Sequence, residues 1–262
     1  MDFLTTKEYL KFTEFANACA KYRYIGLCYG TAGVGKTMSA HQYSAYHLVH
    51  QYDRMNILEK GILDRLQDCK AVFHTVEITN TPKRIKTVLY NKMQLLGTAK
   101  LQAQGKSDIT EIALNAIQAC PLVIVDEADR LTMKTLEQLR DLYDNYGFGL
   151  ILIGMPGIEK RLMRYAQFYS RIGFAHEFRA LGKQDVVSVI NQFCQSFEVE
   201  LSPNPYQKQE AIKTIIVVTR GNFRLTQRLF NQMKRIKEIN KLQYIDKEII
   251  EAARNLLVIG YE

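Results

Sequence analysis

The sequence lacks the features that mark a secreted or membrane-embedded protein. No apolar run approaches the roughly 18 residues that a membrane span needs. The first residues, MDFLTTKEYLKF, carry acidic and polar groups where a secretory signal requires an apolar core. The five cysteines are odd in number, widely spaced and without a C-x-x-C pair, which argues against a disulfide framework or a zinc site and predicts buried, reduced thiols. We therefore expect a cytoplasmic protein.

The composition is otherwise ordinary for a globular chain, with one bias. Of 262 residues, 47% are hydrophobic and 24% are charged, and no internal repeat or low-complexity segment is present. This length predicts one large domain, or a medium domain followed by a small one. Lys and Arg exceed Asp and Glu by eight. Such an excess favours a polyanionic partner such as nucleic acid, although many basic proteins bind none.

The pattern of elements changes near residue 181. Before it, short apolar strands alternate with helices, which predicts an α/β domain with a parallel sheet covered on both faces. The expected strands are 24–29, 71–78, 121–127, 148–153 and 174–178. The expected helices are 5–21, 38–49, 134–145 and 158–169, one opened by Thr81 and Pro82, one opened by the capping box Asp108–Glu111, and a short amphipathic piece at 57–66. Residues 97–106 are expected to form a polar loop.

After residue 181 the strand signal stops. Helices are expected at 183–197, 206–219, 223–240 and 246–257. The chain is therefore divided into an N-terminal helix at 1–25, a nucleotide-binding α/β core at 26–181 and a small all-helical lid domain at 182–262.

One stretch predicts a nucleotide site. Residues 30–37 read GTAGVGKT, which fits the phosphate-loop pattern G-x-x-x-x-G-K-[ST] between a predicted strand and a predicted helix. Glycines let the backbone N–H groups curl around phosphate oxygens, Lys36 reaches the outer phosphates, and the Thr37 hydroxyl binds Mg²⁺. The predicted ATP contacts are Gly30, Thr31, Ala32, Gly33, Val34, Gly35, Lys36, Thr37 and Met38.

A strand ending in two acids completes this site. Asp126 and Glu127 follow the apolar run PLVIV, about 90 residues after the phosphate loop. The sheet would deliver Asp126 beside the loop, where it holds Mg²⁺ together with Thr37, and Glu127 would accept a proton from the attacking water. Alone, such a pair could be a solvated strand end. With a phosphate loop, it predicts ATP hydrolysis to ADP and phosphate.

Four motifs together resemble a known family. The segments GTAGVGKT, LVIVDEADRL, YSRIGF and TRGNFRL, followed by helices, are similar to the AAA+ ATPases and, within them, to the bacterial DNA transposition regulators typified by Mu B and TnsC. The resemblance covers essentially the whole chain. It implies a P-loop AAA+ core followed by a helical lid.

The resemblance also implies roles for arginines. Arg171 matches the arginine finger that reaches into a neighbour's nucleotide site, with Arg161 and Arg164 in reserve for the same role. Arg224 matches the lid residue that contacts the nucleotide of its own subunit. The alternatives are a surface ion pair for Arg171 and an outward arginine at a capped helix start for Arg224.

One position departs from the family. Many AAA+ proteins have Asn, Ser or Thr after the strand that corresponds to 150–153, where this residue orients the attacking water. This chain has Gly154-Met155-Pro156. We expect slow hydrolysis, or help from a Lys or Asp that the sequence does not identify, and an ATPase that acts as a timer more than as a motor.

The resemblance places DNA near the segment after the second strand. Head-to-tail subunits that share ATP would form a ring or a helical filament around duplex DNA. No base-reading motif is present, so contacts to the DNA backbone with little sequence preference are expected. A solvated basic face is the alternative. The predicted DNA-contacting residues are Thr81, Lys83, Arg84, Lys86, Lys106 and Ser107, with Lys100 beside them.

These features favour an ATP-dependent regulator of DNA transposition. It would assemble on duplex DNA, mark the target and recruit or activate a transposase, with ATP hydrolysis controlling disassembly. A helicase loader or replication initiator of the same class is the alternative, distinguished by its partner. A small-molecule kinase would need an acceptor pocket, for which the sequence gives no sign.

Overall fold

A computed structural model describes residues 3–49, 65–66 and 68–257. Most of the amphipathic piece expected at 57–66 lies outside these residues. The described residues form two compact units. One contains the described parts of Met1–Leu10, Thr31–Gly35 and Arg179–Glu262, and the other contains Lys11–Gly30 and the described parts of Lys36–Phe178.

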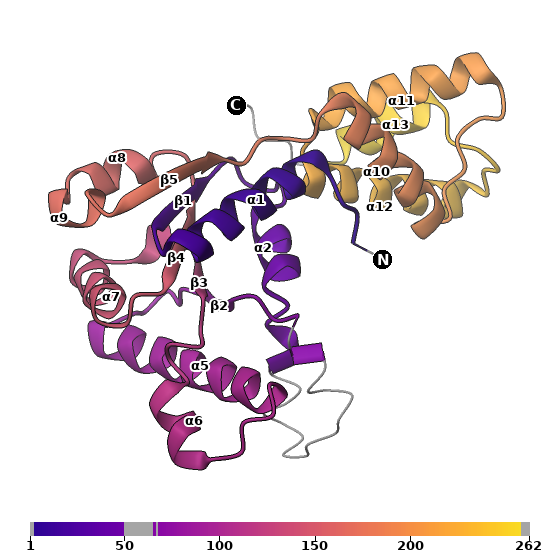
Figure 1. The fold of residues 1–262 in the computed structure, drawn as a ribbon. Coiled ribbons are helices and arrows are strands. Elements are labelled where there is room, and N and C mark those ends of the chain that lie inside the picture. The colour runs from indigo at the N-terminus through magenta and orange to yellow at the C-terminus, as the bar shows by residue number, and fades with distance from the viewer. Residues whose placement is uncertain (1–2, 50–64, 67, 258–262) are drawn as a thin grey trace. The chain divides into compact units, whose positions relative to one another are not determined.

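The second unit is built on a parallel sheet. The described strands form one five-stranded sheet in the order β2-β3-β4-β1-β5, and every pairing is parallel (Figure 1). The strands β3 and β4 are buried along their whole length because their sequences, LVIVD and GLILIG, are continuous apolar runs. The bounds are Ile25–Tyr29 for β1, Val72–Thr75 for β2, Leu122–Asp126 for β3, Gly149–Gly154 for β4 and Ile172–Glu177 for β5.

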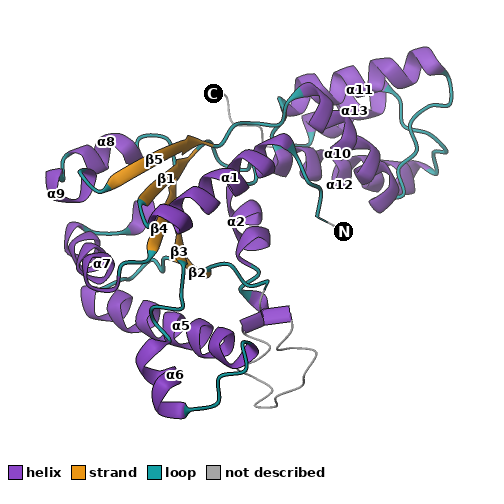
Figure 2. Cartoon of the chain, viewed as in Figure 1, coloured by secondary structure: helices purple, strands orange, loops and turns teal. Residues whose placement is uncertain are grey.

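Helices flank this sheet, as Figure 2 shows. Their starts follow the predicted caps: the Thr81 side chain accepts a hydrogen bond from Arg84 N (3.2 Å), and Asp108 accepts one from Thr110 N (2.7 Å). The bounds are Lys7–Tyr22 for α1, Lys36–Ser44 for α2, Pro82–Ala103 for α5, Ile109–Asn115 for α6, Ala128–Arg130 for the 3₁₀ turn η1, Met133–Tyr146 for α7, Ile158–Met163 for α8 and Ala166–Tyr169 for α9.

The C-terminal region is helical, as predicted. Its helices are α10 (Lys183–Ser196), α11 (Pro205–Thr219), α12 (Phe223–Asn240) and α13 (Lys247–Asn255). They enclose their own hydrophobic core, in which Phe193, Ile215, Phe230 and Ile250 are fully buried. The described residues thus form a parallel α/β sheet domain and a helical C-terminal region, as expected.

The prediction of a loop at residues 97–106 is wrong for most of this segment. Helix α5 continues through Gly97 to Ala103. Gly97 is buried, and a Cβ on this residue would collide with the backbone carbonyl of Ala116. The glycine therefore serves close packing between two segments and does not end the helix.

Two predicted helices are interrupted. Helix α2 ends at Ser44 because Ala45 has a positive φ of 50°, so 38–49 is not one continuous helix. The helix expected at 158–169 is two helices, α8 and α9. They are separated by Arg164 and Tyr165, and Tyr165 leaves the helical region with φ −112° and ψ 80°.

None of the five cysteines, all of which lie among the described residues, forms a disulfide; four are buried, as predicted, whereas Cys194 is half-buried. No helix among the described residues has the length and apolarity to cross a membrane.

Candidate nucleotide-binding site

The phosphate loop joins β1 to α2, and its glycines have backbone conformations that other residues avoid. Gly33 has φ +80° and Gly35 has φ +112°. Gly30 is limited by space, because a Cβ there would overlap the carbonyl of Phe178. The loop backbone therefore has the curvature that a phosphate cradle needs.

Lys36 begins α2 and is buried, with 9% of its surface exposed. Its ammonium donates a hydrogen bond to the carbonyl of Gly30 and so curls back along the loop. Burial lowers the pKa of Lys36, and the carboxylates of Asp126, Asp129 and Glu127 oppose this shift. A buried cation among three acids is suited to an ATP phosphate chelated to Mg²⁺.

Asp126 lies at the end of β3, with 4% of its surface exposed. Its carboxylate accepts hydrogen bonds from the Thr37 side chain and from Glu127 N (2.9 Å). Burial raises the pKa of Asp126, and the Thr37 hydrogen bond opposes that shift. The sheet thus brings together the Thr37 hydroxyl and the Asp126 carboxylate, which are predicted to hold Mg²⁺. Both offer oxygen atoms, the type of ligand that Mg²⁺ prefers.

Glu127 turns away from the strand. Its φ of +56° is in the left-handed region, and its half-exposed carboxylate lies 3.7 Å from the guanidinium of Arg130. Arg130 Nη1 also donates a hydrogen bond to the carbonyl of Val76 (2.8 Å), directly after β2. Glu127 therefore directly follows Asp126, a predicted Mg²⁺ ligand, but its own carboxylate is paired with Arg130.

Sequence reasoning missed Asp129. Its Oδ2 accepts a hydrogen bond from Met155 N (2.7 Å), at the end of β4 where no polar side chain was expected. Arg161, a predicted reserve finger, donates to the backbone carbonyls of Asp129 (2.6 Å) and Leu131 and so supports this turn. The repeated acids in DEAD, residues 126–129, were the signal that could have found Asp129.

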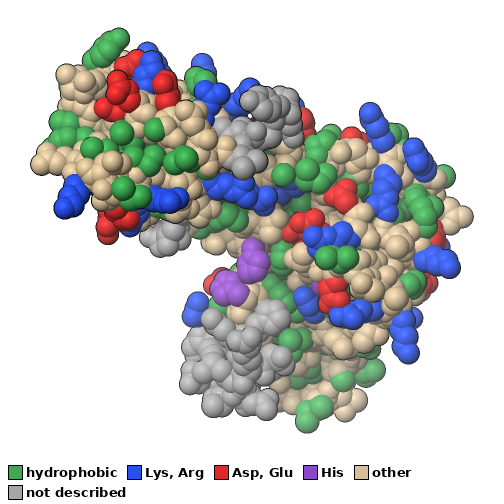
Figure 3. Space-filling model, turned by 180° about the vertical axis from the view of Figure 1, so that it is seen from behind, with side chains coloured by type: hydrophobic (Ala, Val, Ile, Leu, Met, Phe, Trp, Pro, Cys, Tyr) green, Lys and Arg blue, Asp and Glu red, His purple; other side chains and the backbone are tan. Residues whose placement is uncertain are grey.

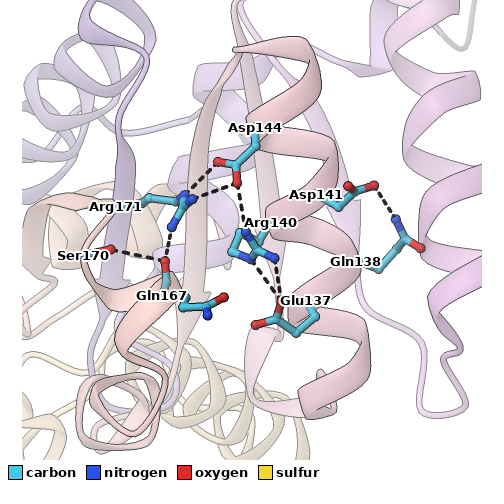
Figure 4. Close-up of polar contacts among 8 residues, drawn as sticks. All are labelled: Glu137, Gln138, Arg140, Asp141, Asp144, Gln167, Ser170 and Arg171. Atoms are coloured by element: carbon cyan, nitrogen blue, oxygen red, sulfur yellow. Dashed lines mark hydrogen bonds and ion pairs between the residues drawn. The ribbon is translucent and has the colours of Figure 1, made fainter.

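Arg171 is paired within its own subunit. Its guanidinium donates to both carboxylate oxygens of Asp144 on α7, at 2.7 and 2.9 Å, and to the carbonyl of Gln167 (Figure 4). Arg140 joins the same carboxylate to Glu137. In contrast, the Arg164 side chain is exposed and has no hydrogen-bond or ion-pair partner in the part of the chain that the structure describes.

The lid motif contacts the phosphate loop through backbone and amide groups. Arg224 N donates to Gly33 O (3.0 Å), and the Asn222 amide donates to Ala32 O (2.7 Å). Asn222 Oδ1 also caps α12 by accepting from Leu225 N (3.0 Å). Asn222 was not predicted as a site residue. The Arg224 side chain is exposed, with no partner among the described residues.

The predicted DNA contacts do not form one patch. Thr81, Lys83, Arg84 and Lys86 lie at the start of α5, whereas Lys106 and Ser107 follow its other end, about 30 Å away along a helix of 22 residues. Lys100 lies in the last turn of α5.

Some of these basic groups are neutralised within the chain. Arg84 pairs with Glu77, and Lys106 pairs with Glu111 (2.7 Å). Lys83 and Lys86 are exposed and have no such partner among the described residues. Across the face in Figure 3, basic side chains are spread over the surface and do not gather in one field.

Comparison with known proteins supports ATP binding. Residues 19–162 match the model of the family described as "AAA domain". A "Potential ATP-binding protein" of Staphylococcus aureus is 40% identical over 269 residues, covering 99% of this chain and 97% of that protein. The "Mu-like prophage FluMu DNA transposition protein B" of Haemophilus influenzae is 24% identical over 246 residues, covering 88% of this chain and 71% of that protein.

Solved structures share the fold. The RuvB Holliday junction branch migration motor of Thermotoga maritima superposes with a TM-score of 0.60 at 16% identity, covering 98% of this chain and 71% of that chain. The ORC2 protein of Aeropyrum pernix superposes with a TM-score of 0.56 at 13% identity, covering 95% of this chain and 67% of that chain.

Proposed function

We propose, from the premise that this chain belongs to the AAA domain family, that it is an ATPase that assembles on duplex DNA and regulates DNA transposition. The observation that carries the transposition role is the similarity to a DNA transposition protein B over 88% of the chain. The net charge of +8 supports a nucleic-acid partner.

The ATPase reaction would use the residues at the ends of β1 and β3. Lys36 and the loop 30–38 would bind the phosphates, and Thr37 with Asp126 would hold Mg²⁺, which neutralises charge on the phosphate oxygens when bound. Glu127 would accept the proton of the attacking water. For this it must separate from Arg130, which lies 3.7 Å away.

Assembly would depend on arginines that face a second subunit or the nucleotide. Arg171 would exchange Asp144 for the phosphate bound by a neighbouring copy, and Arg224 would contact the nucleotide of its own subunit. The exchange costs little free energy, because an exposed ion pair contributes about 0 to 1 kcal/mol to stability. Head-to-tail copies would then form a ring or filament on DNA.

DNA would be held through its phosphates. Lys83 and Lys86, at the start of α5, are the strongest candidates because neither is neutralised by an acid among the described residues. Thr81 and Arg84 flank them, and Lys106 and Ser107 would contribute only if the DNA path extends to the far end of α5. A transposase, and a protein that selects the target, would bind the assembled form.

The test is negative-stain electron microscopy with plain duplex DNA and a slowly hydrolysed ATP analogue. The unaltered protein should form rings or filaments, and Lys36→Ala should form none because it loses the nucleotide. Glu127→Gln should bind ATP and keep its assemblies after ATP is added. Assembly that is equally extensive without nucleotide would overturn the proposal, and capture of a replicative helicase in place of a transposase would favour the helicase-loader alternative.

A further inference from the structure

The end of β4 has no side chain that could act on the nucleotide. β4 lies between β3 and β1, and its last residue, Gly154, pairs with Tyr29, directly before the phosphate loop. This central strand therefore ends between the carboxylate of Asp126 and the start of the loop. A polar group is expected at such a position, and glycine supplies none.

The carboxylate of Asp129 fills this place from a different element. Asp129 belongs to η1, and its Oδ2 accepts a hydrogen bond from Met155 N (2.7 Å). A Cβ on Gly154 would lie 2.8 Å from this oxygen and 2.6 Å from Ile158 Cδ1. Glycine at 154 and the carboxylate of Asp129 are thus coupled, because a larger residue at 154 would displace the acid.

The position of Asp129 is fixed by its backbone. Arg161 donates to the Asp129 carbonyl (2.6 Å) and to the Leu131 carbonyl, so one guanidinium holds both sides of the turn. Leu131 N also donates to Ala128 O (3.1 Å). Asp129 is half-buried, and its Oδ1 has no hydrogen-bond partner among the residues that the structure describes. One carboxylate oxygen is anchored, and the other is available.

The charge of Asp129 also affects the lysine of the predicted nucleotide site. Its charge acts on the ammonium of Lys36, together with the charges of Asp126 and Glu127. The Asp129 carboxylate therefore contributes to the electrostatic environment of Lys36 as well as binding Met155 N.

We propose that Asp129 orients the attacking water in this ATPase, in place of the residue missing at 154. Oδ2 stays on Met155 N, and Oδ1 accepts one hydrogen bond from the water. The water oxygen bonds to the γ-phosphorus while the bond to the β–γ bridging oxygen breaks. The water proton moves to Glu127, and ADP leaves with the electron pair. The inference rests on the proposed ATPase activity.

A carboxylate accepts hydrogen bonds but donates none when ionised. Asp129 and Glu127 can therefore each accept one hydrogen bond from the attacking water. Together these two bonds fix the direction of the lone pair on the water oxygen. A further negative charge near the triphosphate opposes binding, so removing it is not expected to weaken the affinity for ATP.

The test compares Asp129→Asn and Asp129→Ala with Asp141→Asn, an exposed acid on α7 outside the site. Single-turnover hydrolysis of radiolabelled ATP gives the rate, and a fluorescent ATP analogue gives the affinity. Asp129→Ala should slow hydrolysis by roughly 10²-fold while the affinity changes by less than about threefold. The control should match the unaltered protein.

A double variant separates positioning from folding. Asp129→Ala with Gly154→Asn places an amide at the end of β4, and it should recover at least about tenfold of the lost rate. Unchanged hydrolysis in Asp129→Ala, or loss of ATP affinity in parallel with the rate and no recovery in the double variant, would overturn the role of Asp129. Hydrolysis by the unaltered protein without assembly on DNA would instead overturn the proposed function and leave this inference standing.

Discussion

The guanidinium of Arg171, directly before β5, and the carboxylate of Asp144, in the last turn of α7, form a two-point ion pair with distances of 2.7 and 2.9 Å (Figure 4). The pair connects residues 27 positions apart in the sequence. Since its side chains are about one third exposed, its contribution to the free energy of unfolding is about 1 kcal/mol or less. In the proposed assembly, the ATP phosphate of a neighbouring copy could therefore compete for Arg171.

Replacing Arg171 by Ala should remove ATP-dependent assembly and lower DNA-stimulated ATP hydrolysis by roughly 10³-fold, because an arginine finger stabilises charge on the transferring phosphoryl group. The affinity of the monomer for ATP should not change. Sedimentation with and without ATP, together with phosphate release, measures both effects. Arg140→Ala removes a neighbouring cation and should preserve assembly.

The partner of Arg171 gives a second, opposite test. Asp144→Asn weakens the hold on Arg171 and should increase the fraction assembled at a given protein concentration. If assembly is lost in Arg164→Ala and kept in Arg171→Ala, the finger is Arg164, and the Asp144 pair is a structural contact.

The two ends of α5 give a matched pair for DNA binding. Lys83→Ala removes a cation without an acid partner among the described residues, whereas Lys106→Ala removes one already paired with Glu111. Lys83→Ala should weaken binding to all DNA sequences alike and reduce the slope of log K against log salt by about one. Fluorescence anisotropy at several salt concentrations measures this slope. An equal effect from Lys106→Ala would show that DNA reaches both ends of α5.

The fold and the nucleotide site were largely predictable because their signals are local. A phosphate loop between a strand and a helix, and a strand ending in Asp126 and Glu127, place the loop and these acids at the same edge of a parallel sheet, where β4 lies between β3 and β1. The cap at Thr81 is equally local, since the side chain bonds a backbone group three residues later.

What could not be predicted depends on contacts between distant segments. The partner of Arg171 is 27 residues away, and Asp129 meets Met155 across 26 residues. The DEAD motif could have drawn attention to Asp129 itself, but a single sequence gives no signal for which distant residue each of these side chains meets. Gly97 was misinterpreted for the same reason, because glycine followed by polar residues is typical of a loop unless a second backbone passes close to it.

Gly97→Ala tests this interpretation. Alanine favours a helix over glycine by about 1 kcal/mol. Here the added Cβ would collide with the carbonyl of Ala116, and overpacking of this kind costs typically 1–3 kcal/mol or more. The cost of the collision should exceed the gain in helix propensity. The free energy of unfolding, measured by urea denaturation, should fall by roughly 1–2 kcal/mol. Gly182→Ala, where a Cβ meets nothing within 4 Å, should leave that free energy nearly unchanged. Stabilisation by Gly97→Ala would contradict the packing at Ala116.

His74 predicts how stability depends on pH. This β2 side chain is 6% exposed, and burial, together with the positive charge of Lys92, lowers its pKa from 6.5 to about 4, against an opposing effect of Glu77. In the unfolded chain the imidazole binds a proton near pH 6.5, whereas in the fold it stays neutral until about pH 4. The stability from this group is therefore complete above pH 6.5 and is lost as the pH falls towards 4, by roughly 3 kcal/mol in total.

The measurement is urea denaturation of the unaltered protein and of His74→Gln between pH 4 and 7.5. Since all other titrating groups are shared, the difference between the two curves isolates His74. The unaltered protein should lose stability relative to the variant as the pH falls through this window, and a difference that stays constant would show that folding does not change the pKa of His74.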